Sequence, residues 1–132
     1  MILVDTNVWI DLIQRDPVWV EWSKAQIMQA KAAGDVAINA VIYAEMVPAY
    51  DSEDELAHFV RLSKAKLAPL SSNCAYLAGR AFEVYRERGG NKTGVVADFF
   101  IGAQALCEGW PLLTRDPGRY KSFFPKVKLI CP

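Results

Sequence analysis

Four acidic residues lie in apolar surroundings in this sequence, and together they could perform chemistry. Two of them close short apolar runs that are too brief for a helix, so we expect each to follow a buried strand. The other two lie inside apolar stretches with the character of helical turns. The first pair is Asp5 and Asp116, and the second pair is Glu45 and Asp98.

Buried carboxylates are rare unless they are paired or bound to a metal ion, and only Asp116 has a basic residue, Arg115, beside it in the sequence. If the four side chains met at one site, each pair about 4 Å apart would repel by about 4 kcal/mol at an effective dielectric constant of about 20. Protonation or a bound cation would have to relieve this repulsion. Ligands that are all oxygen atoms suit Mg²⁺ or Mn²⁺ better than zinc. We therefore predict a hard-metal site formed by these acids.

Two of the acids also have a simpler interpretation. Asp5 could merely cap the helix that follows it. Asp98 could be an ordinary acid near the positive end of a helix dipole. The apolar neighbours of Asp98, which include Phe99 and Ile101, favour the metal role for that residue.

A site of this kind is suited to the hydrolysis of phosphodiesters. Two divalent ions can stabilise the attacking water and the leaving oxygen, and one of them can generate hydroxide. The only histidine, His58, is expected on a polar helix face, so a metal-bound water is the expected nucleophile. Asn7 and Thr114 are candidates for orienting the carboxylates or a water molecule.

Short apolar runs alternate with helices along the chain, which predicts an α/β fold with a parallel sheet covered on both faces. In such sheets the carboxyl ends of the strands form the ligand-binding edge. The expected strands are residues 1–4, 36–38, 67–70, 111–116 and 127–130. The expected helices follow caps at residues 6 or 7, 16, 39, 52 and 71 or 72, and a last helix begins after residue 94.

The composition is that of one globular domain spanning residues 1–132, with 52% hydrophobic residues. We expect no membrane segment and no secretory signal, because no apolar run approaches about 18 residues and no basic region precedes residue 2. The three cysteines lack a CxxC pair, so we expect them to be reduced and the protein to be cytoplasmic. The formal net charge is zero, with 15 basic and 15 acidic residues. Without the four site acids the remainder would be positive, which permits a nucleic-acid substrate.

The order of these motifs resembles that of PIN-domain nucleases, and most of all the VapC ribonuclease toxins of prokaryotic toxin–antitoxin pairs. The resemblance rests on Asp5-Thr6-Asn7 after an apolar strand, on Glu45, on residues 98–103 and on Thr114-Arg115-Asp116. It extends over essentially the whole chain. One departure concerns the fourth acid, because Pro117 and Gly118 follow it where such toxins often carry polar residues.

The resemblance implies a three-layer α/β/α domain with a short, mainly parallel sheet of about five strands. It also implies an endoribonuclease that depends on Mg²⁺ or Mn²⁺, with RNA as its substrate and with Asp5, Glu45, Asp98 and Asp116 as catalytic metal ligands. The partners that it implies are a second copy of the chain, as a homodimer, and a cognate antitoxin.

Two surfaces could serve those partners. Basic residues flank the third and fourth acids, with Tyr85 and Tyr120 interleaved, and could contact RNA, although a solvated helix face is the alternative. These candidates for RNA binding are Arg88, Lys92, Arg115 and Arg119. Apolar residues between positions 18 and 28, including Trp19 and Trp22, exceed what one core face needs and could seat a partner or belong to the core.

Three other classes of protein deserve comparison. A haloacid-dehalogenase-like phosphatase needs a second acid two residues after the first, where this chain has Asn7. A phosphoacceptor receiver domain needs an acid after its third strand and a lysine after its fifth, where this chain has Leu70 and Cys131. A catalytically silent PIN-like RNA-binding module would not need all four acids.

Overall fold

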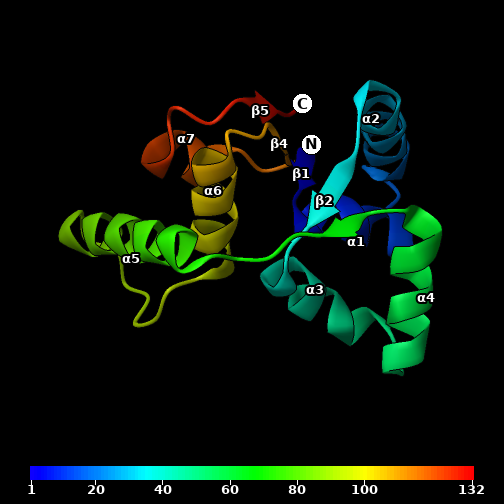
Figure 1. The fold of residues 1–132 in the computed structure, drawn as a ribbon, viewed down its shortest axis with the longest axis horizontal. Coiled ribbons are helices and arrows are strands. Elements are labelled where there is room, and N and C mark those ends of the chain that lie inside the picture. The colour runs from blue at the N-terminus through cyan, green and yellow to red at the C-terminus, as the bar shows by residue number, and fades with distance from the viewer.

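Five short strands form one parallel sheet at the centre of the computed structural model, which describes residues 1–132 (Figure 1). Their order across the sheet is β3-β2-β1-β4-β5, so the first strand of the chain is the central one. The chain therefore builds the sheet outwards from β1, first to one side and then to the other. The strands are β1 (Ile2–Val4), β2 (Val36–Ile38), β3 (Lys66–Leu67), β4 (Leu112–Leu113) and β5 (Leu129–Ile130).

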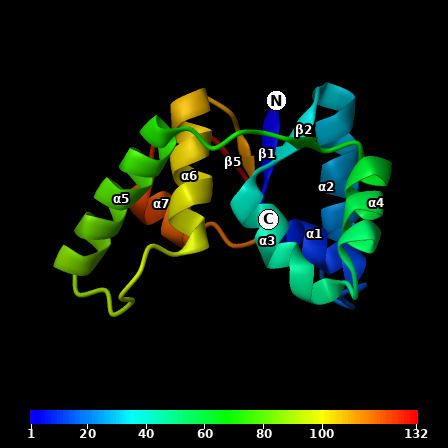
Figure 2. The same ribbon diagram turned by 60° about the horizontal axis from the view of Figure 1, so that its bottom comes forward.

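Helices cover both faces of this sheet. Figure 2 shows α1, α2 and α4 on one side of the strands and α5, α6 and α7 on the other, with α3 below the strands between the two groups. This arrangement confirms the predicted three-layer α/β/α fold. The helices are α1 (Thr6–Ile13), α2 (Val20–Ala33), α3 (Ala40–Met46), α4 (Glu53–Ser63), α5 (Ser72–Glu87), α6 (Ala97–Glu108) and α7 (Gly118–Phe123), and the 3₁₀ turn η1 (Val47–Ala49) follows α3.

Polar caps start several of these helices where the sequence predicts them. The side chains of Asn39, Ser52 and Ser71 each accept a hydrogen bond from a backbone N–H in the first turn of α3, α4 and α5. At the other end, α3 stops before Pro48, which lies in η1, and α6 stops at Gly109 in the left-handed conformation with φ 67°. The helix boundaries thus follow from local side-chain chemistry.

Four local predictions were wrong. Asp5 itself caps α1, in place of Thr6 or Asn7, which agrees with the simpler interpretation of Asp5 as a helix cap. The second helix begins at Val20, because the Asp16 carboxylate caps a separate turn that precedes it. The fourth strand ends at Leu113, so residues 114–116 form a loop, and the edge strand β3 is shorter and earlier than expected.

The short helix α7 was not predicted from the sequence, yet packing holds it against α6. The ring of Phe124 lies where a side chain at Gly102 would be, since a Cβ atom there would come within 2.4 Å of that ring. Phe99 of α6 also packs against Phe123 and Phe124. This close approach of α6 and α7 buries Tyr120, which is only 1% exposed.

The register of the sheet decides which residues meet at its carboxyl edge. Val4 of β1 pairs with Leu113 of β4, and the N–H of Asp5 donates to the Leu113 carbonyl at 2.9 Å. Asp5 and Thr114 directly follow these two strands, so they leave the sheet side by side. No helix in the structure combines the length and the apolar character needed to cross a membrane.

Candidate active site

Asp5 is the most enclosed of the four acids, with 5% of its surface exposed. Its Oδ1 accepts a hydrogen bond from the backbone N–H of Thr6 at 2.7 Å. Its Oδ2 accepts from the Thr114 hydroxyl at 2.8 Å, the Tyr120 hydroxyl at 2.9 Å and the Asn7 amide at 3.2 Å. Four donors from three different parts of the chain therefore converge on one carboxylate.

The environment of Asp5 opposes its ionisation. The pKa of this carboxyl is raised from 3.8 to about 6. Burial is the largest cause and the negative charge of Asp98 adds to it, whereas the hydrogen bonds from Thr114, Tyr120 and Thr6 lower the pKa. Burial acts in this direction because a charge removed from water is disfavoured. A nearby cation would restore the ionised form, which is what a metal ligand requires.

Asp98 is the second residue of α6 and lies close to Asp5. Its Oδ2 is 3.2 Å from Nη1 of Arg119, and its Oδ1 lies 3.4 Å from the hydroxyl oxygen of Tyr120. No basic residue adjoins Asp98 in the sequence, but α7 brings Arg119 to it from 21 residues away.

Tyr120 lies between Asp5 and Asp98 and contacts both. Burial raises the pKa of its phenol far above the usual range, and the charges of Asp5 and Asp98 add to the effect. The phenol therefore stays protonated and acts as a donor. A phenol has one hydrogen, and the shorter distance assigns it to Asp5.

Glu45 reaches the site through Thr6. Its Oε1 accepts a hydrogen bond of 2.7 Å from the Thr6 hydroxyl. The expectation that Glu45 is a buried acid is wrong, because α3 buries Ile42 and Met46 and leaves Glu45 exposed on another face.

Asp116 stands apart from the other three acids. It is exposed in the loop after β4, where its backbone N–H donates to the Thr114 hydroxyl at 3.1 Å. Its side chain lines an open cavity of about 440 Å³ together with that of Asp98. The other residues of this cavity are Gly118, Arg119, Ser122 and Phe123.

The four acids thus surround one region without forming a closed cluster. No group of three or more His, Cys, Asp or Glu side chains comes close enough to hold a metal ion. The donor set nevertheless fits a hard cation in kind, because every candidate ligand is a carboxylate oxygen. Tyr120 contacts both Asp5 and Asp98, so these two acids lie close together.

Arg115 has a structural contact that the sequence did not reveal. Its Nε and Nη2 donate to the two oxygens of Asp11 at 2.9 and 3.0 Å, and Asp11 is only 1% exposed. From the sequence, Arg115 could pair with Asp116, contact phosphate or form a surface salt bridge; in the structure its partner is Asp11. Its guanidinium also lies 5.5 Å from the ring centre of Trp19, and the Ser23 hydroxyl donates to Asp11 at 2.7 Å.

This ion pair connects to the site through Asn7. The backbone N–H of Arg115 donates to the Asn7 side-chain oxygen at 3.1 Å, and the Asn7 amide donates to Thr114 and Asp5. The Asp11–Arg115 pair therefore fixes the loop that carries Thr114. Asp11 stands within an apolar stretch, the same signal that singled out Asp98, and it could have been noticed on that ground.

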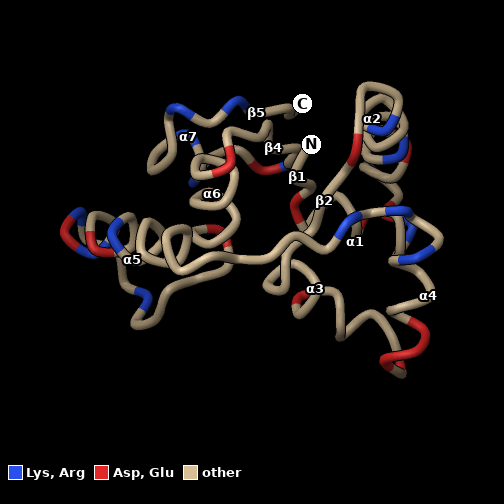
Figure 3. Tube along the Cα trace, in the orientation of Figure 1, with Lys and Arg blue, Asp and Glu red and all other residues tan.

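The remaining RNA-binding candidates lie near the ends of α5 and α7. Nη1 of Arg88 contacts the Ser122 carbonyl at 3.4 Å, and its guanidinium lies 5.3 Å from the ring centre of Phe123. Lys92 is exposed in the loop that follows α5. Figure 3 shows basic residues on the end of α5 and in this loop, with acidic residues among them.

The apolar residues between positions 18 and 28 divide between core and surface. Ile27 is buried and Trp22 packs against the core, whereas Val18 and Met28 are exposed. Trp19 lies edge-on to Trp22, with ring centres 6.0 Å apart. Part of this predicted partner surface is therefore core.

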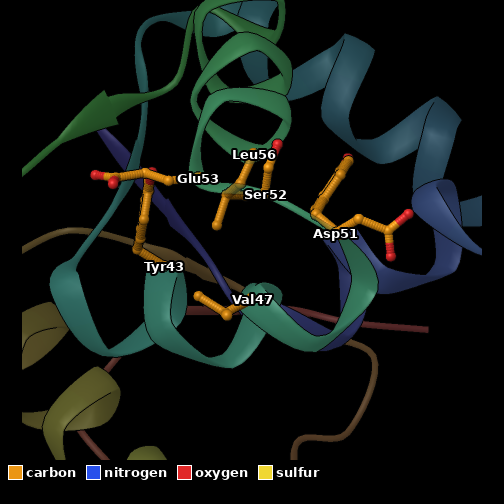
Figure 4. A pocket seen from close by; sticks show the side chains of 7 residues that line it. Tyr43, Val47, Asp51, Ser52, Glu53 and Leu56 are labelled. Carbon is orange, nitrogen blue, oxygen red and sulfur yellow. The ribbon is translucent and has the colours of Figure 1, made fainter.

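A separate apolar cavity of about 330 Å³ lies between α3, η1 and α4 (Figure 4). Tyr43, Val47, Tyr50 and Leu56 provide its apolar lining, and acidic side chains stand at its edge. A neighbouring cavity beside Tyr50 extends along α4 to the exposed Leu62, and His58, also exposed as predicted, contributes to it. None of the four site acids lines either cavity.

Comparison with known proteins identifies the family. A family model described as PIN domain matches residues 2–122, and this chain belongs to the PIN domain family. The resemblance drawn from the acidic motifs is thereby confirmed. A comparison with curated protein sequences finds no match.

Solved structures with this fold include chains of toxin–antitoxin complexes. VapBC2 from Rickettsia felis, bound to a DNA fragment from their promoter, is 19% identical with a TM-score of 0.75, and the match covers 100% of this chain and 99% of that chain. DNA-bound VapBC from Salmonella typhimurium is 14% identical with a TM-score of 0.71, covering 98% and 96%. A toxin–antitoxin complex from Klebsiella pneumoniae is 25% identical with a TM-score of 0.61, covering 91% and 90%.

The raised pKa of Asp5 makes the stability of the metal-free chain depend on pH. Between pH 3.8 and about 6, folded chain retains a proton that unfolded chain releases. The stabilisation is therefore complete below pH 3.8 and is lost as the pH rises through about 6. In EDTA, the free energy of unfolding should fall over this range by about 3 kcal/mol more in the wild type than in Asp5→Asn.

Urea unfolding of both proteins from pH 4 to pH 7 measures this difference. Because only the change with pH is compared, a constant destabilisation of the variant does not affect the result. Equal pH dependence in the two proteins would contradict the assignment of this titration to Asp5.

Proposed function

We propose that this chain is an endoribonuclease that depends on Mg²⁺ or Mn²⁺, and that it is the toxin of a toxin–antitoxin pair. The observation that carries the proposal is the buried Asp5 carboxylate at the end of the central strand, with Asp98 held beside it. In an open parallel sheet, ligands usually bind at the carboxyl ends of the strands, at the point where the strand order reverses. In this sheet that point is the end of β1, where Asp5 lies. Membership of the PIN domain family supports the same site.

In this proposal Asp5 and Asp98 hold the ion, directly or through water, and Glu45 and Asp116 complete its surroundings. When bound, a divalent ion would supply charge for the phosphate oxygens and an activated water for attack. Thr114 and Asn7 hold the Asp5 carboxylate in one orientation. Such supporting residues are typically worth about 10–100-fold in metal affinity or activity.

The residues around the ion have separate tasks. Thr6 orients the Glu45 side chain through its hydroxyl. The open cavity between Asp98 and Asp116 would receive the phosphodiester, and Arg119 lines it. Arg88 and Lys92 are exposed, and Arg88 contacts Ser122 and Phe123 of this cavity, so both would add positive charge for RNA. Arg115, which pairs with Asp11, acts on the fold of the loop, so we no longer assign it to RNA.

RNA is proposed as the substrate because PIN-domain toxins of this form act on RNA. The receiver-domain alternative does not fit, since flavodoxin-like domains have the strand order 2-1-3-4-5, whereas this sheet has the order 3-2-1-4-5. The dehalogenase-like alternative is set aside by the PIN family match. A silent RNA-binding module would retain the basic residues but would not require a buried, unfavourably ionised Asp5.

Incubation of the purified protein with total RNA tests the function. We expect cleavage in Mg²⁺ and none in EDTA, with discrete ends after mapping. Asp5→Asn and Asp98→Asn should lower the rate by about 100-fold or more, since removing a ligand should cost at least as much as removing its supporting partners.

A matched control is Asp35→Asn, which removes an exposed acid that pairs with Lys66 outside the site. This variant should cleave at the wild-type rate. Cleavage in EDTA, or wild-type cleavage by Asp5→Asn, would contradict the proposal.

We also propose an antitoxin as the partner and a homodimer as the assembly. The structures with this fold that are described as VapBC or toxin–antitoxin complexes support such a partner. The apolar cavity between α3 and α4, with Asp51 and Glu53 at its edge, suits a segment that combines apolar anchors with basic residues (Figure 4).

Light scattering of the protein, alone and with the product of the neighbouring gene, measures both assemblies. We expect twice the monomer mass for the protein alone and a larger complex with the antitoxin. A substitution of Leu56 would disturb the core, because this residue is buried. Val47 is exposed in the cavity wall, so Val47→Asp is the variant that tests the cavity. It should weaken the complex by about tenfold or more, as expected for burial of an unpaired charge. If Val47→Asp binds the antitoxin as tightly as the wild type does, the cavity is not part of the interface.

A further inference from the structure

We propose that Arg119 exchanges one anionic partner for another: it binds Asp98 when no cation is held there and an RNA phosphate when a cation takes Asp98. Metal binding and RNA binding would then be coupled through this single side chain. The inference rests on the proposed function and adds a residue that links its two ligands.

The present contact between Arg119 and Asp98 is one that a stronger ligand could replace. It is a single contact of 3.2 Å between Nη1 and Oδ2, and the side chains are 31% and 39% exposed. A guanidinium offers five N–H donors, so this geometry leaves most of them for other acceptors. Partly exposed ion pairs of this kind are weak. The pair between Arg115 and Asp11 differs from it, because it has two hydrogen bonds and the Asp11 side chain is only 1% exposed.

Arg119 would keep its place without Asp98, because aromatic rings hold it. Its guanidinium carbon lies 5.5 Å from the ring centre of Tyr85 and 5.6 Å from that of Phe99. Phe99 is fully buried and packs against Phe82 and Tyr85, so this support is fixed by the core. The aromatic support does not depend on the charge of Asp98.

The cavity next to this side chain has one basic residue. Its charged lining consists of Asp98, Asp116 and Arg119. With both acids unneutralised, the cavity repels an anion, whereas a cation at Asp98 both cancels negative charge and repels the guanidinium. The N–H donors of Arg119 are then free for an anion in the cavity, and a phosphodiester matches their planar, two-pronged geometry.

Arg88 lacks this arrangement and serves as a control. It lies over the ring of Phe123 and contacts a carbonyl oxygen, with no carboxylate partner. Both arginines would contribute positive charge to RNA binding. Only Arg119 competes with a cation for a proposed ligand.

Two measurements on Arg119→Gln test the coupling. In a calorimetric titration with Mn²⁺, the variant should bind the ion about threefold or more tightly than the wild type, because Asp98 has lost its competing partner. A fluorescent single-stranded RNA is then titrated in Ca²⁺ and in EDTA at constant ionic strength, with a gel to verify that it stays intact. The gain in RNA affinity on adding Ca²⁺ should be about fivefold smaller in the variant than in the wild type, which is the low end of typical coupling between sites.

Arg88→Gln should weaken RNA binding by the same factor in Ca²⁺ and in EDTA and leave Mn²⁺ affinity unchanged. The inference is overturned if Arg119→Gln binds Mn²⁺ no more tightly than the wild type, or if its RNA affinity rises with Ca²⁺ as much as that of the wild type. If the wild type still cleaves RNA in Mg²⁺, such a result removes the coupling and leaves the proposed function intact. A wild type that does not cleave RNA contradicts the function instead, and the Mn²⁺ titration still decides whether Arg119 competes for Asp98.

Discussion

The burial of the Asp5 carboxylate is the constraint on which the rest of the site depends. A charge enclosed at the end of the central strand must be matched by donors or by a cation. The chain supplies four donors, from α1, from the residue after β4 and from α7. The positions of Thr114 and Tyr120 are therefore set by Asp5 as much as by their own local sequence.

Packing at some distance from the Asp5 carboxylate brings these donors to it. Gly102 lets Phe124 approach α6, and that approach brings Tyr120 to the edge of the sheet. On the other side, the pair between the buried Asp11 and the partly buried Arg115 ties the loop after β4 to α1. Removing Arg115 would leave the buried charge of Asp11 uncompensated, which typically costs about 3–5 kcal/mol. The site is thus held from both layers of helices.

Much of the fold could be predicted because its signals are local. Short apolar runs, caps such as Asn39 and Ser71, and terminators such as Gly109 act within a few residues, and they define the alternation of strands and helices. The acids were found for the same reason, as charges in apolar stretches. Glu45 shows the limit of that signal, because a helix can turn an acid in an apolar stretch towards solvent.

The contacts between distant residues could not be predicted in this way. Tyr120 meets Asp5 across 115 residues and Arg115 meets Asp11 across 104, and both contacts depend on the register of β1 with β4. The helix α7 was missed because it has six residues, begins with a glycine after a proline, and is stabilised by packing. Without α7 the sequence gives no reason to place Arg119 beside Asp98.

The central claim is that Asp5 and Asp98 hold one cation between them. The most direct measurement is the anomalous scattering from Mn²⁺ in crystals of the protein grown with a saturating concentration of that ion. We expect a peak in direct or water-mediated contact with carboxylate oxygens of both Asp5 and Asp98. A structure in which Mn²⁺ binds elsewhere, while Asp5 keeps all four of its donors and Asp98 keeps Arg119, would contradict it.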